Sequence, residues 1–481
     1  MRKKIPVNWR WVKIQDVSEK SQYGFTTKAV NEGDVYLLRT TDITNEDINW
    51  EQVPFCRDNP DDIDKYRLEE GDVLISRAGS VGESFLINNL PFPNVVFASY
   101  LIRFKPTINR KYFKYFLQSP DYWNAITENQ SGIAVPNVNA TKLNAIELPL
   151  SPDKTQHRIV EKIEELFSGL DHGVENLKKA QRQLKTYRQA VLKDAFEGKL
   201  TKEWRERQDD LTTPEELLQQ IKAERKAHRQ RELTEWEKEV EQWEKDGKSE
   251  RKPRKPRKVN EVEPIPEKNL NKLAELPNNW LWVKLGRVIE QPKYGTAEKC
   301  DYDFDGYGVL RIPNISKGII DSEDMKYAPL EEDEASKYAL QEGDILTIRS
   351  NGSIDLVGKC ALIREPDTNF LHAGYLIRLR PYEAVADSRY LLNVLSSVSL
   401  RSQIESKAKS TSGVNNINSG ELQDLIIPIC STEEQKEIIN EIESRLSVVD
   451  QLEQTINENL QKAEALRQSI LKKAFRGELV L

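Results

Sequence analysis

Cysteine and histidine are scarce in this sequence, whose 481 residues contain only four of each. The cysteines (Cys56, Cys300, Cys360 and Cys430) are scattered and form no Cys-x-x-Cys pair, which argues against a structural zinc site and more strongly against a disulfide framework. No stretch approaches the roughly 20 apolar residues that span a bilayer. The start, MRKKIPVNWRWVK, has no apolar run behind it, so it does not resemble a signal peptide. We expect a cytoplasmic protein without a metal site or a membrane segment.

The common catalytic motifs are missing as well. The sequence has no G-x-x-x-x-G-K-[ST] phosphate loop, no G-x-G-x-x-G dinucleotide signature and no H-E-x-x-H zinc pair. Only His372 lies in a globular region, where we expect a structural or DNA-contact role before a general base. The net charge is −7, so binding to a nucleic acid would have to depend on local basic patches. An enzymatic function is weakly supported.

The sequence does contain an internal repeat of two long helical segments. Residues 151–200 begin SPDKTQHRIVEKIEELF and close LKDAFEGKL, and residues 431–481 begin STEEQKEIINEIESRL and close LKKAFRGEL. Each carries a narrow apolar stripe at three- and four-residue steps, which is typical of helices packed along a coiled-coil seam. The stripes are Leu177, Ala180, Leu184, Tyr187 and Val191, and then Val449, Ile456, Leu460, Ala463, Leu466, Ile470 and Ala474. We expect the two helices to pack against each other.

The ends of these helices carry recognisable signals. Ser431 and Glu434 form a capping-box pattern, and Pro152 follows Ser151 at the first helical position. Gly198 and Gly477 stand where a left-handed C-terminal cap is expected.

A globular segment precedes each long helix, and the second repeats the first. VNWRWVKI (7–14) returns as NNWLWVKL (278–285), YGFTTK as YGTAEK, and EEGDVLISR as QEGDILTIR. Short β-type runs separated by turn signals predict a mixed α/β fold. The framework positions match but the stretches between them do not, since residues 46–68 share little with 318–339. Two similar scaffolds with unlike surfaces suggest that each binds a different target.

Residues 201–260 have no counterpart after the second long helix. Thr213, Pro214 and Glu216 predict the start of a highly charged helix that ends near Gly247. The run KSERKPRKPRK follows, and its prolines and like charges favour an extended, flexible linker. This run could also lie on phosphates.

Polar loops at corresponding positions of the two globular segments are the candidate binding residues. Loops rich in Gly, Ser and Asn allow close approach to phosphates and base edges, arginine pairs with guanine or phosphate, and Asn and Thr suit adenine and thymine edges. The same patterns also fit ordinary hairpin turns. In the first segment the candidates are Arg39, Thr40, Thr41, Arg77, Ser80, Asn137 and Asn139. In the second they are Arg311, Asn314, Arg349, Ser350, Asn351, Ser353, Asn415 and Asn416.

Aromatic residues near these loops have a simpler interpretation. Tyr100 and Tyr375 precede arginines in an alternating strand pattern, so we expect them to be core residues. Trp9 and Trp280 belong to another alternating pattern and are expected to pack rather than to stack on bases.

The repeat of NWRWVKI, EEGDVLISR and the two helix starts, with the closings LKDAFEGKL and LKKAFRGEL, resembles the specificity (S) subunits of type I restriction-modification systems. The resemblance covers nearly the whole chain. It implies an α/β fold with two similar mixed α/β target-recognition domains separated by two long antiparallel coiled-coil helices. The implied segments are a first recognition domain (1–150), a first helix (151–200), a charged helical extension and linker (201–276), a second recognition domain (277–430) and a second helix (431–481).

The resemblance also implies a function. Each domain would read one half of a bipartite target in double-stranded DNA, and the helix pair would set the gap between the halves. Two copies of a methylation subunit, which methylate adenine N6, and the restriction subunits would dock on the chain. The chain itself would be non-catalytic and bind no cofactor, because S-adenosylmethionine, ATP and Mg belong to those partners. The alternatives are a coiled-coil adaptor whose two globules bind protein or small ligands, and a nuclease or methyltransferase that acts alone.

Overall fold

The computed structural model describes residues 4–44, 47–130, 137–247, 252–256, 264–316, 318–411 and 413–480. The chain divides into two compact units, and each unit contains parts of both long helices. Unit 1 comprises residues 1–181 and 454–481, and unit 2 comprises residues 182–453. None of the helices in the described ranges combines the length and the apolar character needed to cross a bilayer.

Unit 1 contains a mixed α/β domain. Two four-stranded sheets form its centre, in the orders β2-β11-β8-β9 and β10-β4-β7-β3, with β10 and β4 parallel. The strands are β1 (Arg10–Lys13), β2 (Gln22–Tyr23), β3 (Ala29–Val30), β4 (Tyr36–Leu38), β5 (Ile43–Thr44), β6 (Asp47–Ile48), β7 (Phe55–Cys56), β8 (Val73–Ser76), β9 (Ser84–Leu86), β10 (Val95–Phe97), β11 (Leu101–Phe104) and β12 (Glu147–Leu150). The short helices are α1 (Ile63–Tyr66), α2 (Arg110–Phe116), α3 (Pro120–Gln130) and α4 (Ala140–Asn144).

Unit 2 repeats this architecture. Its sheet β14-β23-β19-β21 matches β2-β11-β8-β9, and its parallel pair β15 and β22 matches β4 and β10. The strands are β13 (Leu281–Lys284), β14 (Lys293–Tyr294), β15 (Tyr307–Leu310), β16 (Ile315–Ser316), β17 (Ile319–Ile320), β18 (Lys326–Ala328), β19 (Ile345–Ile348), β20 (Ser350–Asn351), β21 (Cys360–Leu362), β22 (Leu371–His372), β23 (Leu376–Leu379), β24 (Lys409–Thr411), β25 (Val414–Asn416) and β26 (Ile426–Ile429). The helices are α6 (Lys202–Glu206), α7 (Pro214–Lys245), α8 (Glu267–Leu270), α9 (Glu332–Ala335), α10 (Ser388–Leu395), α11 (Val398–Lys407) and α12 (Ser419–Gln423).

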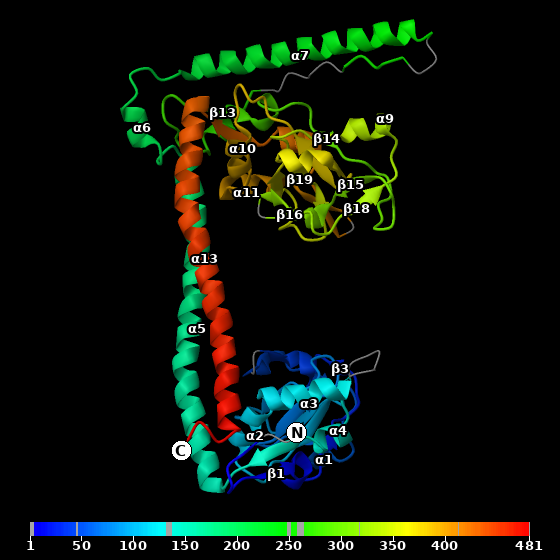
Figure 1. Cartoon of the computed structure of the whole chain (residues 1–481), viewed down its shortest axis with the longest axis vertical. Coiled ribbons are helices and arrows are strands. Elements are labelled where there is room, and N and C mark those ends of the chain that lie inside the picture. Colours follow the sequence, from blue (N-terminus) through cyan, green and yellow to red (C-terminus); the bar gives the residue numbers. More distant parts are fainter. Residues whose placement is uncertain are drawn as a thin grey trace. The chain divides into compact units, whose positions relative to one another are not determined.

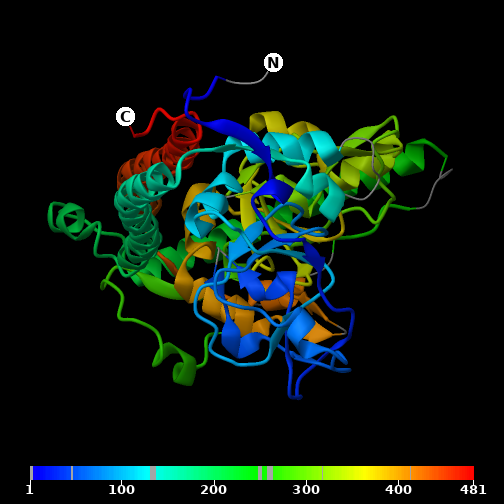
Figure 2. The ribbon, with the colours of Figure 1, turned by 90° about the horizontal axis from the view of Figure 1, so that it is seen from below.

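The two long helices, α5 (Asp153–Phe196) and α13 (Thr432–Ala474), run antiparallel within each unit. In unit 1 the core contains Phe167 from the first half of α5 together with Phe475, which directly follows α13. In unit 2 the core contains Phe196, the last residue of α5, together with Ile438 near the start of α13. Figure 1 and Figure 2 show the two helices side by side. The prediction of two paired long helices is confirmed.

The seam between the helices contains charged side chains as well as apolar ones. Arg188 pairs with Asp450 in unit 2, and Arg467 pairs with Asp171 in unit 1. Two members of the predicted stripes, Tyr187 and Leu466, are about half exposed, so they are only partly covered. A stripe with three- and four-residue steps drifts around a straight helix, which carries some of its members toward solvent.

A buried glutamine fastens the start of each long helix to its domain. The Gln156 side-chain Nε2 donates to the Ser151 carbonyl at 2.9 Å, and its Oε1 accepts from the Asn109 backbone N–H at 3.1 Å. Gln435 makes the equivalent bonds to Cys430 (2.8 Å) and Asp387 (2.8 Å). These two glutamines therefore hold the same position in the two units.

A glycine in the left-handed region fastens the end of each long helix. Gly198 has φ of 73° and packs on Pro277, while Gly477 has φ of 74° and packs on Pro6. A Cβ atom at either glycine would lie 2.3 Å from the proline Cγ atom. The predicted caps are confirmed, and each also forms a close contact that requires glycine.

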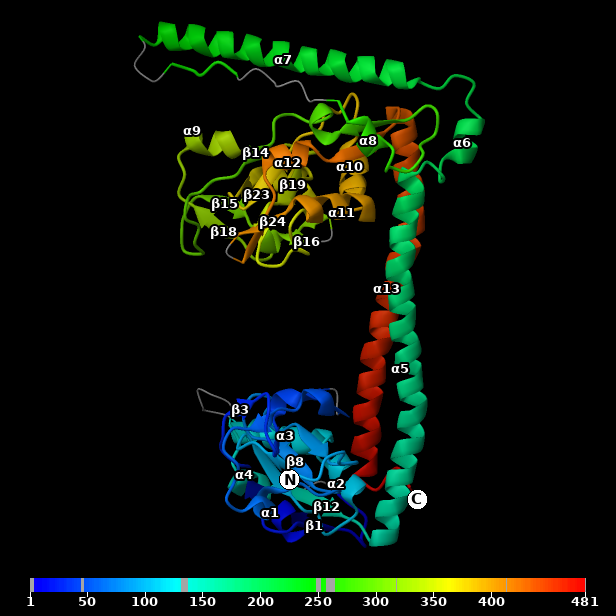
Figure 3. The same ribbon diagram turned by 180° about the vertical axis from the view of Figure 1, so that it is seen from behind.

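The charged extension consists of α6 and the long helix α7, which starts at the predicted capping box of Thr213 and Glu216. Residues 252–256 lie along α7 (Figure 3). The Trp236 indole donates to the Pro253 carbonyl at 3.1 Å, and Arg229 donates to the Pro256 carbonyl at 2.7 Å. This part of the expected linker is therefore packed on a helix, and the rest of that run lies outside the described residues.

Candidate nucleic-acid interface

The predicted loops of unit 1 meet at the end of β8. Arg77 follows the strand, and Ala78 pairs with Asn137 in an isolated β-bridge. Ser80 is exposed at the tip of the loop, and Asn139 caps α4 by accepting from the Lys142 amide at 2.9 Å. The structure therefore brings two segments that are 60 residues apart in sequence into one surface.

Unit 2 brings its corresponding loops together in the same way. Arg349 follows β19, and the next two residues, Ser350 and Asn351, form β20, which pairs with Asn416 and Asn415 of β25. The Asn415 side chain donates to the Gly352 carbonyl at 3.0 Å. Ser353, also predicted, is exposed, and its amide donates to the Asn351 side chain at 2.9 Å.

The arginines Arg77 and Arg349 lie over tyrosine rings. The guanidinium carbon of Arg77 is 5.1 Å from the ring centre of Tyr23, and that of Arg349 is 4.8 Å from the ring centre of Tyr294. A cation held over an aromatic face is attracted by the ring quadrupole. These tyrosines were missed in the sequence, although both begin a repeated Tyr-Gly pair that pointed to them.

The glycine of each Tyr-Gly pair explains the local fold. A Cβ atom on Gly24 would lie 2.3 Å from the Ala98 carbonyl oxygen, and one on Gly295 would lie 2.0 Å from the His372 carbonyl oxygen. Only glycine allows the two backbones to approach so closely. This close approach fixes the preceding tyrosine beside the arginine loop.

Tyr100 and Tyr375 are surface residues, which contradicts the expectation that they belong to the core. Their exposed fractions are 60% and 62%. Both precede their strands, β11 and β23, and so lie outside the alternating inward-facing positions. Their carbonyl oxygens accept from the Arg77 and Arg349 amides, at 2.9 and 3.0 Å, so the two phenols belong to the loop surface. Trp9 and Trp280 are buried, as expected.

The second pair of predicted arginines is already neutralised by carboxylates. Arg39 forms two hydrogen bonds to Asp42, at 3.0 and 2.6 Å, and these raise the pKa of the guanidinium above its ordinary value. Arg311 lies 3.2 Å from Asp324, whose pKa is lowered mainly by a hydrogen bond from Tyr302 and further by the Arg311 charge. Both arginines therefore help to build turns.

The turns that follow these arginines differ between the units. Thr41 is exposed and Thr40 is half-buried in unit 1. Asn314, at the corresponding turn of unit 2, is buried, and its amide group donates to the Asp321 and Asp324 carbonyls at 2.8 and 2.9 Å. Its side-chain oxygen accepts from the Arg311 amide at 2.8 Å. This side chain is buried and its hydrogen bonds shape the turn, so a contact of Asn314 with DNA stays a prediction.

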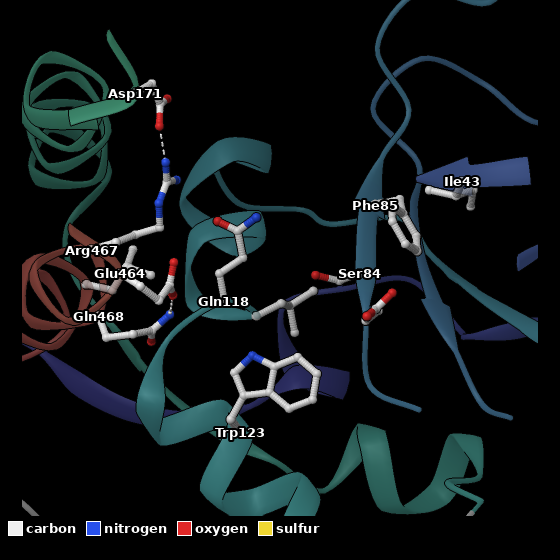
Figure 4. Close-up of a pocket in the computed structure, with 12 residues that line it drawn as sticks. Ile43, Ser84, Phe85, Gln118, Trp123, Asp171, Glu464, Arg467 and Gln468 are labelled. Carbon is white, nitrogen blue, oxygen red and sulfur yellow. Dashed lines mark hydrogen bonds and ion pairs between the residues drawn. The ribbon is translucent and has the colours of Figure 1, made fainter. Parts of the chain in front are cut away.

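A pocket of about 570 Å³ lies beside the loops of unit 1 (Figure 4). Asp171 from α5 and Arg467 from α13, which form an ion pair, line one side. Ile43 and Phe85 lie on the opposite side (Figure 4), and they belong to β5 and β9, the strands that follow the Thr40–Asp42 turn and the Arg77 loop. The pocket therefore lies between the helix pair and these two strands.

Known proteins share this arrangement. The sequence model of the family described as "Type I restriction modification DNA specificity domain" matches residues 6–179 and 277–462. The chain belongs to this family. Members of this family act in DNA sequence specificity.

Individual relatives agree over most of their length. The chain is 26% identical to the Escherichia coli K12 type I restriction enzyme EcoKI specificity subunit, over 92% of this chain and 82% of the relative. It is 25% identical to the Salmonella potsdam StySPI specificity subunit, over 99% and 90%. A solved chain from work on the complex assembly and conformational transition of the type I R-M system superposes with a TM-score of 0.66, at 17% identity over 99% of this chain and 100% of that one, which supports the fold of this specificity-family chain.

Proposed function

We propose that the chain is the non-catalytic DNA-recognition subunit of a type I restriction-modification complex and that its two domains read the two halves of a bipartite target. The observation that carries this proposal is the repeat of one scaffold with different loops. The equivalent positions Thr41 and Pro313, or Ala78 and Ser350, offer different groups at the same place. A chain that read one symmetric sequence twice would have no need of two loop sets.

The assignment to segments follows the repeat. Residues 1–150 and 277–430 are the proposed recognition domains, and residues 151–200 and 431–481 are the proposed helical regions on which methylation subunits dock, in two copies. Restriction subunits complete the complex. S-adenosylmethionine, ATP and Mg bind to these partners rather than to this chain, and the complex works in the cytoplasm. Adenine has to leave the base stack for methylation, and that step belongs to the methylation subunits.

A methylome of cells that express the chain with its methylation partner tests the proposal. The expected result is a split motif with methylated adenine on both strands. Exchange of the loops of one domain for those of another specificity-family member should change one half of the motif and leave the other half unchanged. A coiled-coil adaptor would leave no methylated motif and would show no salt-sensitive binding to duplex DNA. Methylation by the purified chain alone, with methyl donor but no partner, would contradict the non-catalytic assignment.

A further inference from the structure

The loop surfaces of the two units share one arrangement of side chains despite their different sequences. In both, an arginine lies over a tyrosine whose hydroxyl accepts a backbone N–H, from Ala140 to Tyr23 at 2.9 Å and from Ser419 to Tyr294 at 3.0 Å. The two tyrosines are exposed to nearly the same extent, 39% and 38%. The second tyrosine of each unit, Tyr100 or Tyr375, is exposed, and its carbonyl oxygen accepts from the amide of the arginine.

The two stacked arginines carry charge that the domain does not neutralise. Among the described residues, neither Arg77 nor Arg349 has a carboxylate within ion-pair distance. Besides its contact with the ring, the Arg349 side chain donates a long 3.5 Å hydrogen bond to the Gly374 carbonyl. Arg39 and Arg311 differ in this respect, since Asp42 and Asp324 neutralise them. A half-buried cation held in one orientation by a ring is suited to an external anion.

The presence of the same arginine–tyrosine pair in both domains indicates that the anion it binds is a DNA phosphate. The two domains read different sequences under the proposed function, so a group that is the same in both cannot distinguish the two half-targets. The feature that every half-target shares is the phosphate backbone, and phosphate contacts position a protein on DNA without carrying sequence information. Base discrimination has to come from positions where the domains differ, such as Ser80 and Ser353, which correspond to Gly352 and Val81 in the other domain.

We infer that the Arg77–Tyr23 and Arg349–Tyr294 pairs are equivalent phosphate clamps, one for each half-target, and that neither arginine reads a base. The stacked tyrosine orients the guanidinium, and the exposed tyrosine beside it borders the same site. This inference rests on the proposed DNA-binding function. It assigns to these arginines the phosphate contact and excludes the guanine contact that the sequence left open.

Salt-dependent binding of the full chain, measured with its methylation partner present, tests the inference. Each phosphate contact adds about 0.9 to the slope of log K against log salt. Arg349→Ala should lower the affinity for a target duplex and for a non-target duplex by the same factor, about tenfold, and should reduce the slope by about 1. Arg77→Ala should do the same, and the double variant should lose about 2 from the slope. The methylated motif should stay unchanged in every variant.

Two matched variants distinguish a phosphate contact of Arg349 from the general effect of removing a positive charge from the chain. Arg349→Lys keeps the charge and should retain the salt slope while losing less affinity than Arg349→Ala. Lys238→Ala removes one exposed charge from α7 and should leave both affinity and slope unchanged. Loss of affinity for the target duplex alone, or a relaxed motif at one base pair, would mean that Arg349 reads a base. Unchanged binding by folded Arg349→Ala would also overturn the clamp, whereas failure of the wild-type complex to bind DNA would overturn the proposed function itself.

Discussion

Glu434 offers the sharpest test of how unit 2 is held together. Its side chain is 0% exposed. It accepts hydrogen bonds from the Thr201 hydroxyl at 2.8 Å, from Arg205 Nη1 at 2.5 Å and from Asn279 Nδ2 at 2.9 Å. These partners come from the segment after α5 and from the segment before β13. One carboxylate therefore joins the start of α13 to two other parts of the chain.

Replacement of Glu434 by alanine should cost far more than loss of a surface ion pair. The Arg205 side chain, which is only 12% exposed, would lose its carboxylate partner and keep the Thr201 hydroxyl, the Gly198 carbonyl and the Trp280 ring. Removal of one partner of a buried pair costs about 3–5 kcal/mol, because the remaining charge is left uncompensated. An exposed pair is worth about 0–1 kcal/mol. The expected loss for Glu434→Ala is therefore about 3–5 kcal/mol of unit 2 stability.

Hydrogen exchange read by mass spectrometry suits a chain with two units, because it reports local opening and does not assume one unfolding transition. Peptides from α6 and β13 should exchange at least a hundredfold faster in Glu434→Ala, at about 1.4 kcal/mol for each tenfold change. Glu433→Ala, at the exposed neighbouring position, is the matched control. The reasoning fails if Arg205→Ala costs as much in the Glu434→Ala background as in the wild type, because the pair would then not be coupled.

Three further perturbations have distinct outcomes. Gly198→Ala would place a Cβ atom 2.3 Å from Pro277 at φ of 73° and should lower the urea midpoint of unit 2. Gly169→Ala, its control with open space around it, should raise the free energy of unfolding of unit 1 by about 1 kcal/mol. Burial lowers the pKa of His372 from 6.5 to about 4. Between these pH values His372 is protonated in the unfolded chain and neutral in the folded chain. The free energy of unfolding should therefore fall by about 1.4 kcal/mol per pH unit as the pH drops through that window. His372→Phe should remove this pH dependence in urea titrations. Asn314→Ala should destabilise unit 2 by about 1–3 kcal/mol in the same assay and leave the methylated motif unchanged.

The sequence was sufficient for features that depend on repetition and spacing. The constant offset between the repeats predicted equivalent helices, and the structure gives α5 as Asp153–Phe196 and α13 as Thr432–Ala474, close to the expected ranges. Gly198 and Gly477 were correctly expected in the left-handed region because few other residues adopt it. Such features are set by the backbone and by neighbours in the chain.

The errors concern side-chain direction and pairing across long sequence distances. Tyr100 and Tyr375 were expected in the core from an alternating pattern, but each stands one residue before its strand, where alternation does not apply. Asn314 was selected for its polarity, but its side chain is buried and forms hydrogen bonds with the backbones of Asp321, Asp324 and Arg311. No local pattern shows whether an asparagine faces solvent or completes a turn.

Several polar side chains of the loops are already hydrogen-bonded within their own loop, which leaves fewer residues that can contact a base. A residue that caps a helix or closes a turn, as Asn139 and Asn314 do, could contact a base only by giving up the bonds that shape its loop. Arg39 would likewise have to leave Asp42, and a phosphate contact would have to compete with that carboxylate. Exposed groups such as Thr41, Ser80 and Ser353 carry no such cost. Base reading should therefore depend on a few loop-tip residues, while the capped and paired residues behind them hold the tips in place.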